Sequence, residues 1–370
     1  MKTDILMRNS FYILLVVAGL AMSCKSNYKD LGDGLYAEMQ TSKGDMIIRL
    51  EQEKTPVTVA NFVSLVEGTN PFVSDQFKGK PYYDGLTFHR VMQDFMIQGG
   101  DPTATGSGSP GYRFKDEFDP SLTHSGKGVV SMANGGPKTN GSQFFITQKE
   151  TPWLNNVHSV FGEVVVGLEV IDSIAAVPTD QRNKPLDSVV MERVQIVRKG
   201  KAAKEFDAVQ IMTDYFAAET AAEEKIRAYG QELVGQKETA TELPSGLKYI
   251  VLQDGDGPKP SQGQQISVSY AGWLENGTLF DTSEEAIARE FGKYEELFKM
   301  HRGDFSPITM VYSPDMRMIA GFKEALLAMK AGDKWRLYIP PHLGYGSQGS
   351  GPIPPNSTLV FDLEMELLSN

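Results

Sequence analysis

Residues 88–101 read FHRVMQDFMIQGGD, and residues 140–147 read NGSQFFIT. The same region contains SMAN at 131–134, WL at 153–154, and His158. Together these motifs supply an arginine, two amides and several large apolar side chains, but no nucleophile paired with a base. The residue types therefore indicate a binding pocket rather than a site for covalent chemistry.

The sequence around these motifs alternates short β-type runs with turns, which indicates an antiparallel sheet. One segment differs, because residues 56–68 begin with a proline and repeat apolar residues at helical spacing, so they predict a helix. Strands are predicted at 35–41, 44–50, 86–92, 96–98, 128–132, 144–147, 159–165 and 189–197. The predicted fold class is mainly β with α.

The order of these motifs resembles the cyclophilin family of peptidyl-prolyl cis–trans isomerases, over roughly residues 35–198. The resemblance implies a closed antiparallel β-barrel with two helices, which we expect to occupy residues 35–199. It implies a catalytic role for Arg90, with Phe95, Gln98 and His158 beside it. The implied substrate-binding residues are Met96, Ala133, Asn134, Gln143, Phe145, Trp153 and Leu154.

Proline isomerisation suits these residue types because the reaction breaks no bond. Amide resonance opposes rotation about an X-Pro bond with a barrier of roughly 18–20 kcal/mol. As the amide twists, the prolyl nitrogen becomes pyramidal and regains a lone pair, and a guanidinium donor beside it then binds most strongly. An apolar slot and one fixed arginine are the groups that this reaction needs, and we expect no cofactor.

The composition of the chain changes sharply at Gly200. Residues 201–234 are rich in Ala, Glu and Lys, contain no proline and place apolar residues at spacings of three and four. This pattern predicts an amphipathic helix with a break near Thr220. We interpret residues 200–242 as a helical linker between two domains.

A second group of motifs follows the linker. They read VSY at 268–270, GTLFDTS at 277–283, MIAGF at 318–322 and IPPNSTLVFD at 353–362. Their order resembles the FK506-binding (FKBP) family of prolyl isomerases over nearly all of residues 243–370. The resemblance implies a curled antiparallel sheet over one short helix, in agreement with the helix predicted at 321–330. It places a proline pocket at Tyr270, Phe280, Asp281, Met318, Ile319, Phe322, Tyr345, Ile353 and Phe361.

This second domain departs from the family pattern at the pocket. Phe322 stands where many members have tryptophan, and Ile308 and Met310 stand where aromatic residues are usual. The loop 347–352 is shorter than usual, and a charged, helix-prone segment at 284–300 interrupts the β pattern as an insertion. Because a shallower aromatic box binds proline more weakly, binding with little turnover is an alternative role for this domain.

The N-terminal residues have the order of an export signal. Two basic residues precede the apolar run 11–20, and small residues then lead to Cys24. The arrangement resembles a bacterial lipoprotein signal, although Ala21 stands where that motif prefers leucine. We expect a signal peptide at 1–23, a lipid on Cys24 and a tether at 24–34, hence a protein anchored in the bacterial cell envelope and facing the periplasm. The alternative is an ordinary signal peptide with a chance cysteine.

Composition excludes several classes of function. A single cysteine rules out disulfides and cysteine-based zinc sites within one chain, and the five histidines lack close ligand spacing, so no metal is expected. A formal net charge of −11 without a basic stripe argues against nucleic-acid binding. The expected partners are unfolded or partly folded exported polypeptides with X-Pro bonds, and the membrane through Cys24.

Three functional hypotheses follow for the whole chain. The first is a bifunctional prolyl isomerase that assists the folding of exported proteins. The second is an envelope holdase chaperone, or a binding protein whose second domain recognises proline-containing segments with little turnover. The third is a tethering protein in which one domain recruits a partner.

Overall fold

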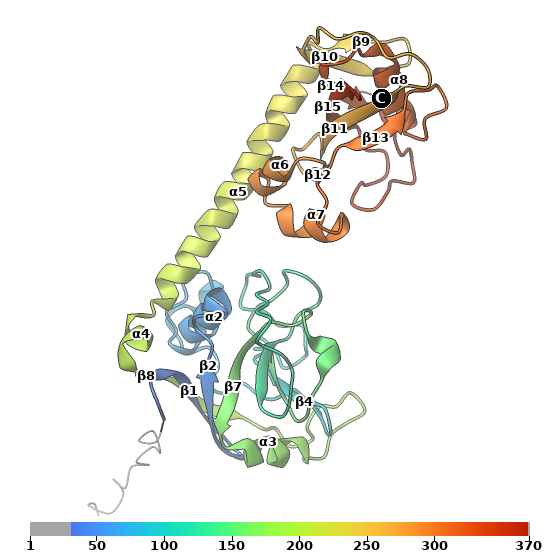
Figure 1. Ribbon diagram of the computed structural model, residues 1–370. Helices are drawn as coiled ribbons and strands as arrows, with labels where there is room; N and C mark the ends of the chain where they lie inside the picture. Colours follow the sequence, from blue (N-terminus) through green and yellow to red (C-terminus); the bar gives the residue numbers. More distant parts are fainter. Residues whose placement is uncertain (1–30, 369–370) are drawn as a thin grey trace, which may run out of the picture. The chain divides into compact units, whose positions relative to one another are not determined.

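The computed structural model describes residues 31–368. The predicted signal peptide at 1–23 and the predicted lipid on Cys24 lie outside the described residues, as does most of the predicted tether. The chain forms two compact units, with the boundary between Tyr215 and Phe216. Each unit is built on its own antiparallel sheet (Figure 1). Within residues 31–368, no helix is both long and apolar enough to cross a membrane.

The first unit contains an eight-stranded sheet in the order β3-β4-β6-β5-β7-β2-β1-β8. Its strands are β1 (Gly34–Thr41), β2 (Gly44–Leu50), β3 (Arg90–Met92), β4 (Met96–Gly99), β5 (Val129–Met132), β6 (Phe144–Thr147), β7 (Val160–Val166) and β8 (Met191–Lys199). The predicted strands are recovered, except that the run 86–92 forms a strand only from Arg90. The mainly β fold class is therefore confirmed.

The two edges of this sheet approach each other just before β3 and β8. An isolated bridge pairs Thr87 with Val190, and the Phe88 N–H donates to the Val189 carbonyl at 3.0 Å. The sheet therefore curls round on itself. A continuous barrel ladder is not confirmed, because the pairing at this seam is confined to the short segments that precede the two edge strands.

Two α-helices accompany this sheet, as the cyclophilin resemblance implies. The helical segments are α2 (Pro56–Val66), α3 (Leu168–Ala175) and the short 3-10 turns η3 (Asp75–Phe77) and η4 (Pro152–Leu154). Phe62 of α2 is fully buried, with its ring 5.0 Å from that of Tyr83 and 5.4 Å from that of Phe161. The first amides of α2 bond to Glu117 from a distant loop, and the Thr58 N–H reaches that carboxylate at 2.7 Å.

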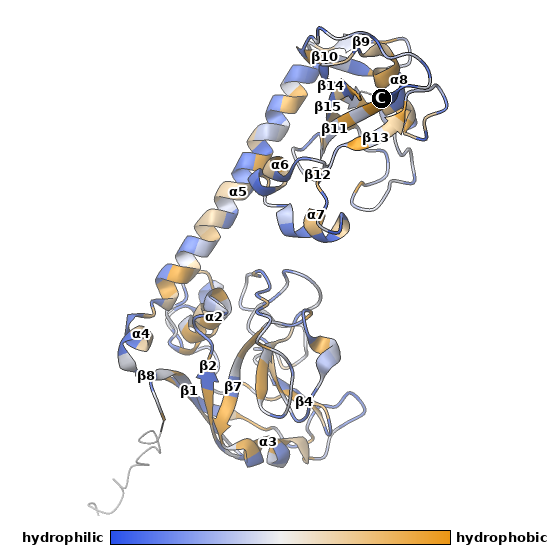
Figure 2. Ribbon diagram, viewed as in Figure 1, coloured by the Kyte–Doolittle hydropathy of each residue, from blue (hydrophilic) through white to orange (hydrophobic). Residues whose placement is uncertain are grey.

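The region predicted as a helical linker contains α4 (Gly200–Glu205) and α5 (Ala208–Lys237). The predicted break near Thr220 is wrong, because α5 runs without interruption for 30 residues. Figure 2 shows polar residues along much of α5 with apolar residues between them. Those apolar residues pack into the units: Met212 is fully buried in the first, and Leu233 is fully buried in the second.

The second unit contains a sheet in the order β12-β11-β15-β14-β10-β9, and β13 also pairs with β11. Its strands are β9 (Thr241–Glu242), β10 (Lys248–Gln253), β11 (Gln265–Leu274), β12 (Leu279–Thr282), β13 (Ile308–Val311), β14 (Lys334–Ile339) and β15 (Leu359–Leu367). Its helical segments are α6 (Glu285–Glu290), α7 (Tyr294–Met300), α8 (Ala320–Ala328) and the turn η5 (Pro341–Leu343). Helix α8 confirms the predicted short helix, and α6 and α7 form the predicted insertion.

Both faces of this second sheet are covered, whereas the FKBP resemblance implies one short helix on one face. On the first face, Phe322 of α8 packs into the larger apolar cluster. On the opposite face, Trp273 and Tyr338 pack with Leu233 of α5 and Leu297 of α7. The added layer forms because large apolar side chains project from both faces of β11 and β14, and leaving either set in water would be unfavourable.

Candidate active sites

The first cavity lies along β3, β4 and β6. Arg90 of β3 lies opposite Gln98 of β4, and Gln98 lies opposite Phe145 of β6. The cavity measures about 310 Å³, and its lining brings together most of the residues predicted for the first site. They are Arg90, Phe95, Met96, Gln98, Ala133, Asn134, Phe145, Leu154 and His158.

Arg90 is held in this cavity by a chain of amides. Its Nη1–H donates to Gln98 Oε1 at 3.0 Å, and Gln98 Nε2 donates to Gln143 Oε1 at 3.1 Å. Gln143 Nε2 in turn donates to the carbonyl oxygens of Gly106 at 3.1 Å and Gly108 at 3.0 Å. Within residues 31–368 no carboxylate forms an ion pair with Arg90, so a neutral amide positions the guanidinium and its charge is not paired.

The apolar wall of the cavity is centred on Phe145, which is buried and contacts two histidine rings. His124 stacks on it with centroids 5.8 Å apart, and His158 meets it edge-on at 5.4 Å. His158 Nδ1 lies 3.0 Å from the Met132 carbonyl, so this nitrogen carries the proton. Burial lowers the pKa of His158, which favours a neutral ring with Nε2 available as an acceptor.

Two predicted residues lie at the margin of this cavity rather than in its lining. Trp153 is 62% exposed and stacks on Phe95, with ring centroids 6.3 Å apart. Gln143 lines a neighbouring cavity that shares Gln98, Ala133 and Asn134 with the first. The two cavities therefore adjoin.

The second unit has a cavity of about 700 Å³. Its lining includes every residue predicted for the second pocket: Tyr270, Phe280, Asp281, Met318, Ile319, Phe322, Tyr345, Ile353 and Phe361. It also includes Met300 from the insertion, Ile308 from β13, and Arg317. Met310, by contrast, packs against the apolar cluster of the sheet.

Three phenylalanines make the apolar floor of this second cavity. The ring of Phe361 lies 5.4 Å from that of Phe322 and 5.4 Å from that of Phe280, at interplanar angles of 85° and 82°. These are the edge-to-face arrangements that aromatic rings favour. With Phe322 only 2% exposed, the position where many relatives carry tryptophan still provides a buried aromatic surface.

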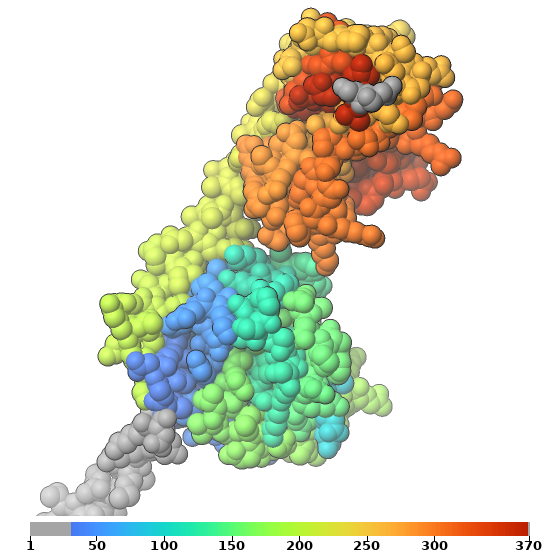
Figure 3. Space-filling view, in the orientation of Figure 1, coloured from blue at the N-terminus to red at the C-terminus, as the bar shows by residue number. Residues whose placement is uncertain are grey.

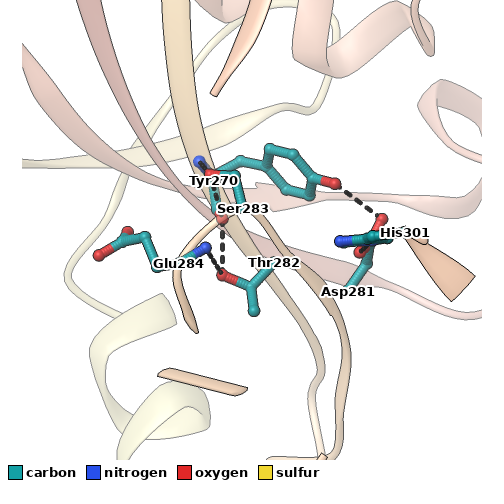
Figure 4. A network of polar contacts seen from close by, with 6 residues as sticks. All are labelled: Tyr270, Asp281, Thr282, Ser283, Glu284 and His301. Carbon is teal, nitrogen blue, oxygen red and sulfur yellow. Dashed lines mark hydrogen bonds and ion pairs between the residues drawn. The ribbon is translucent and has the colours of Figure 1, made fainter. Parts of the chain in front are cut away.

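The carboxylate in the lining of the second cavity is that of Asp281, shown in Figure 4. Its Oδ2 accepts a hydrogen bond from the Tyr270 hydroxyl at 3.0 Å, and its Oδ1 lies 2.8 Å from His301 Nε2. Burial, and then the nearby Asp281 carboxylate, raises the pKa of Tyr270, so the hydroxyl remains a donor. Thr282 and Ser283 bond to the backbone of Tyr270 and fix β12 against β11.

Comparison with known proteins decides the family. The model for cyclophilin type peptidyl-prolyl cis-trans isomerase/CLD matches residues 36–196. Peptidyl-prolyl cis-trans isomerase A of Mycobacterium tuberculosis is 48% identical over 165 residues, which cover 43% of this chain and 91% of that relative. The chain belongs to the cyclophilin-type peptidyl-prolyl isomerase family. The model for FKBP-type peptidyl-prolyl cis-trans isomerase matches residues 257–366, so an FKBP-type domain follows the cyclophilin-type domain.

Other similar proteins have the same kind of name. Peptidyl-prolyl cis-trans isomerase B of Streptomyces anulatus is 47% identical over 172 residues, covering 45% of this chain and 98% of that relative. A solved cyclophilin type peptidyl-prolyl cis-trans isomerase of Cryptosporidium parvum is 33% identical and covers 45% of this chain and 98% of its own, with a TM-score of 0.40.

Both families consist of peptidyl-prolyl cis–trans isomerases, so this chain is an enzyme of that class and acts on proline-containing polypeptides. The cyclophilin-type cavity combines an apolar slot with one fixed cation. The FKBP-type cavity combines an aromatic floor with one bonded carboxylate. Among residues 31–368, no group of three or more His, Cys, Asp and Glu side chains has the arrangement to hold a metal ion.

Sequence reasoning misses three residues at these sites. His124 lies beneath Phe145, where its Nε2 is 3.0 Å from Ser131 Oγ, and no motif of the sequence marks it. His301 and Met300 belong to the insertion, which the family pattern does not describe. The apolar and charged spacing within 284–300 predicts helices there, but it carries no signal that their end reaches Asp281.

Proposed function

We propose that the cyclophilin-type domain accelerates X-Pro isomerisation by donating a hydrogen bond from Arg90 to the prolyl nitrogen of the twisted amide. The observation that carries this proposal is the bond from Arg90 to Gln98, a neutral acceptor, in the absence of a paired carboxylate among the described residues. The charge is thus free to act on the lone pair that appears as the amide twists. The apolar wall of Phe145 and Leu154 holds the proline ring beside it.

The test compares two variants of the full chain with a short prolyl peptide. Arg90→Ala should lower the cyclophilin-type contribution to kcat/KM by roughly 2–4 kcal/mol while peptide affinity and stability change little. Phe145→Ala should weaken both affinity and turnover, because it opens the apolar slot. Turnover left when both substitutions are combined in one protein measures the FKBP-type domain. If Phe145→Ala lowers turnover but a folded Arg90→Ala protein turns over peptide as fast as the unmodified chain, the assignment is contradicted, as it would be by full rescue with Arg90→Lys.

We propose that the substrates are exported proteins and that the enzyme is lipid-anchored in the bacterial cell envelope, facing the periplasm. The support is the N-terminal order of basic residues, the apolar run 11–20 and Cys24. Mass analysis of the protein isolated from membranes should show a lipid-bearing N-terminus at Cys24. A soluble protein cleaved elsewhere, with a free Cys24 thiol, would contradict the anchor.

A second candidate function concerns the FKBP-type domain, which we propose as a binder of proline-containing segments with little turnover. The observation in its favour is the exposed apolar mouth of the larger cavity, where Met300 is 52% exposed and Tyr345 is 39% exposed. In an Arg90→Ala, Phe145→Ala double variant, in which the cyclophilin-type cavity neither turns over nor binds well, binding would be indicated by suppressed aggregation of an unfolded client together with negligible peptide turnover. Substantial turnover in that protein would favour catalysis by both domains.

A further inference from the structure

The carboxylate of the FKBP-type pocket bonds to a residue from the insertion. His301 follows α7 directly, and its Nε2 is 2.8 Å from Asp281 Oδ1. The two side chains are only 15% and 31% exposed, respectively. Because a carboxylate oxygen accepts, His301 carries a hydrogen on Nε2, and this N–H donates a hydrogen bond to Asp281 Oδ1. Figure 4 shows His301 and Tyr270 both directed at Asp281.

Helix α7 is packed firmly enough to hold this histidine in place. Leu297 lies four residues before His301, hence on the same side of the helix, and it is fully buried in the cluster that contains Trp273. The ring of Phe305 stacks on Tyr294 at 5.8 Å and contacts His301 at 5.3 Å. The insertion forms the orange lobe of the second unit in Figure 3.

Helix α6 ties the same insertion to α5. Phe291 contacts Tyr229 of α5 at 5.1 Å and Trp273 of the sheet at 5.8 Å, and Lys225 pairs with Glu290 at 3.1 Å. The insertion is therefore built onto two neighbouring elements rather than suspended as a free loop. At its far end, Met300 lines the proline cavity next to His301.

We propose that the insertion is one wall of the FKBP-type prolyl site, in which His301 is a positioning residue for Asp281. A carboxylate beside an apolar floor is costly unless donors hold it. Two donors, Tyr270 and His301, each take one oxygen and leave further lone pairs to accept a peptide N–H from the bound chain. This inference rests on the proposed binding of proline-containing segments by this domain.

The experiment uses the full chain labelled with 13C at its methionine methyl groups and titrated with a proline tetrapeptide. Met96 lines the cyclophilin-type cavity, whereas Met300 and Met318 line the FKBP-type cavity. The methyl signals of one titration therefore report peptide binding at each cavity separately. Each signal is assigned from its Met→Leu variant. Peptide exchange spectra in the Arg90→Ala background report turnover at the second site.

His301→Leu keeps a side chain of similar size but removes the N–H donor. It should raise the peptide Kd measured from the Met318 methyl signal about tenfold, and it should lower turnover by the FKBP-type domain by a similar factor. His301→Gln keeps an N–H donor and should recover most of that loss. The Kd read at Met96 should not change in either variant. Glu295→Gln, an exposed change on the same helix, is the matched control and should leave both sites as they are.

Three other outcomes would each overturn the proposal, and each would do so for a different reason. If His301→Leu folds and keeps its affinity and turnover, the bond to Asp281 does not position the site. If His301→Gln fails as badly as His301→Leu while Glu295→Gln is normal, the histidine acts by packing and not as a donor. If the unmodified chain shifts Met96 but neither Met300 nor Met318, the FKBP-type domain binds no proline segment, and its proposed function fails as well.

Discussion

At the scale of single residues, Gln98 links the polar side chains of the cyclophilin-type site. It accepts from Arg90 and donates to Gln143, and Gln143 ends the chain on two backbone carbonyl groups. A flexible arginine side chain thereby acquires one orientation before a substrate arrives. Preorganised donors of this kind stabilise a transition state without having to reorient during the reaction.

The first prediction concerns this amide chain. Gln98→Leu removes the acceptor of Arg90, so the cyclophilin-type kcat/KM should fall about tenfold, in line with the loss of a hydrogen bond to a charged group. Gln98→Glu keeps an acceptor but pairs the charge of Arg90, and it should also lower turnover because the donor is then engaged. Peptide exchange kinetics measure both effects. Wild-type turnover in a folded Gln98→Leu protein would show that Gln98 does not orient the arginine.

The second prediction concerns buried histidines of the same domain. Burial lowers the pKa values of His89, His124 and His158. Each is therefore favoured in its neutral form in the folded protein, compared with an unfolded pKa of about 6.5. Their contribution to stability is fully present above that pH and is lost as the pH falls through the lower folded values.

Urea unfolding of the cyclophilin-type domain should accordingly show a free energy of unfolding that falls as the pH drops below about 6.5. His124 is the least exposed of the three histidines. His124→Gln should make the free energy of unfolding depend less steeply on pH, whether or not the substitution changes stability at pH 8. An identical slope in the variant would mean that His124 does not titrate differently in the folded and unfolded states.

At the scale of elements, α5 is part of the FKBP-type core as well as a connection. Arg336 of β14 donates to both oxygens of Asp362 at 2.7 Å. It also donates to Gln236 of α5 at 2.6 Å and to Tyr229 of α5 at 3.0 Å. The buried guanidinium thus has three partner residues on two elements, and two of the three belong to α5.

The third prediction tests this role with neighbouring residues of α5. Leu233 is fully buried and Val234 is 47% exposed. Leu233→Ala should lower the free energy of unfolding of the FKBP-type domain by about 2–4 kcal/mol, because it leaves a cavity against Trp273 and Tyr338. Val234→Ala should change it by less than about 0.5 kcal/mol. Fluorescence of Trp273 and Trp335 follows this domain during urea unfolding.

Equal effects of the two substitutions would show that α5 does not belong to this core.

The same packing has a practical consequence for domain fragments. A fragment that begins at residue 240 lacks Leu233 and the α5 partners of Arg336, whereas one that begins at 216 keeps them. The longer fragment should be the more stable of the two by at least the amount expected for Leu233→Ala.

At the scale of the whole molecule, two unrelated folds on one chain present cavities of different character. The cyclophilin-type pocket is smaller and contains an unpaired cation, and the FKBP-type pocket is larger and contains a bonded carboxylate. The chemistry of the pockets thus predicts overlapping but unequal substrate preferences.

The fourth prediction concerns where the molecule resides. Cys24→Ser should release the protein from the membrane fraction, because the proposed lipid has no other attachment point in a chain with a single cysteine. Turnover of a prolyl peptide should be unchanged, since both pockets lie beyond residue 89. Fractionation of cells that express either form measures the effect. Retention of Cys24→Ser in the membrane would refute the anchor.

The sequence by itself determined the two families, most strands of the first sheet, helices α2 and α8, and most of the lining predicted for the two cavities. It did so because motifs such as FHR at 88–90 and FMIQGG at 95–100 lie on short paired strands, where register brings nearby residues together. The departures at Phe322 and Ile308 were also visible, since they replace single members of an ordered pattern.

Only the tertiary structure decided the contacts between residues far apart along the chain. Glu117 bonds to Thr58 at a separation of 59 residues, Arg336 bonds to Tyr229 at a separation of 107, and His301 reaches Asp281 from an insertion. Neither periodicity nor spacing specifies which surface an added helix will cover. Those partners were selected by the apolar side chains left on the outer sheet face and by buried polar groups that require a bond.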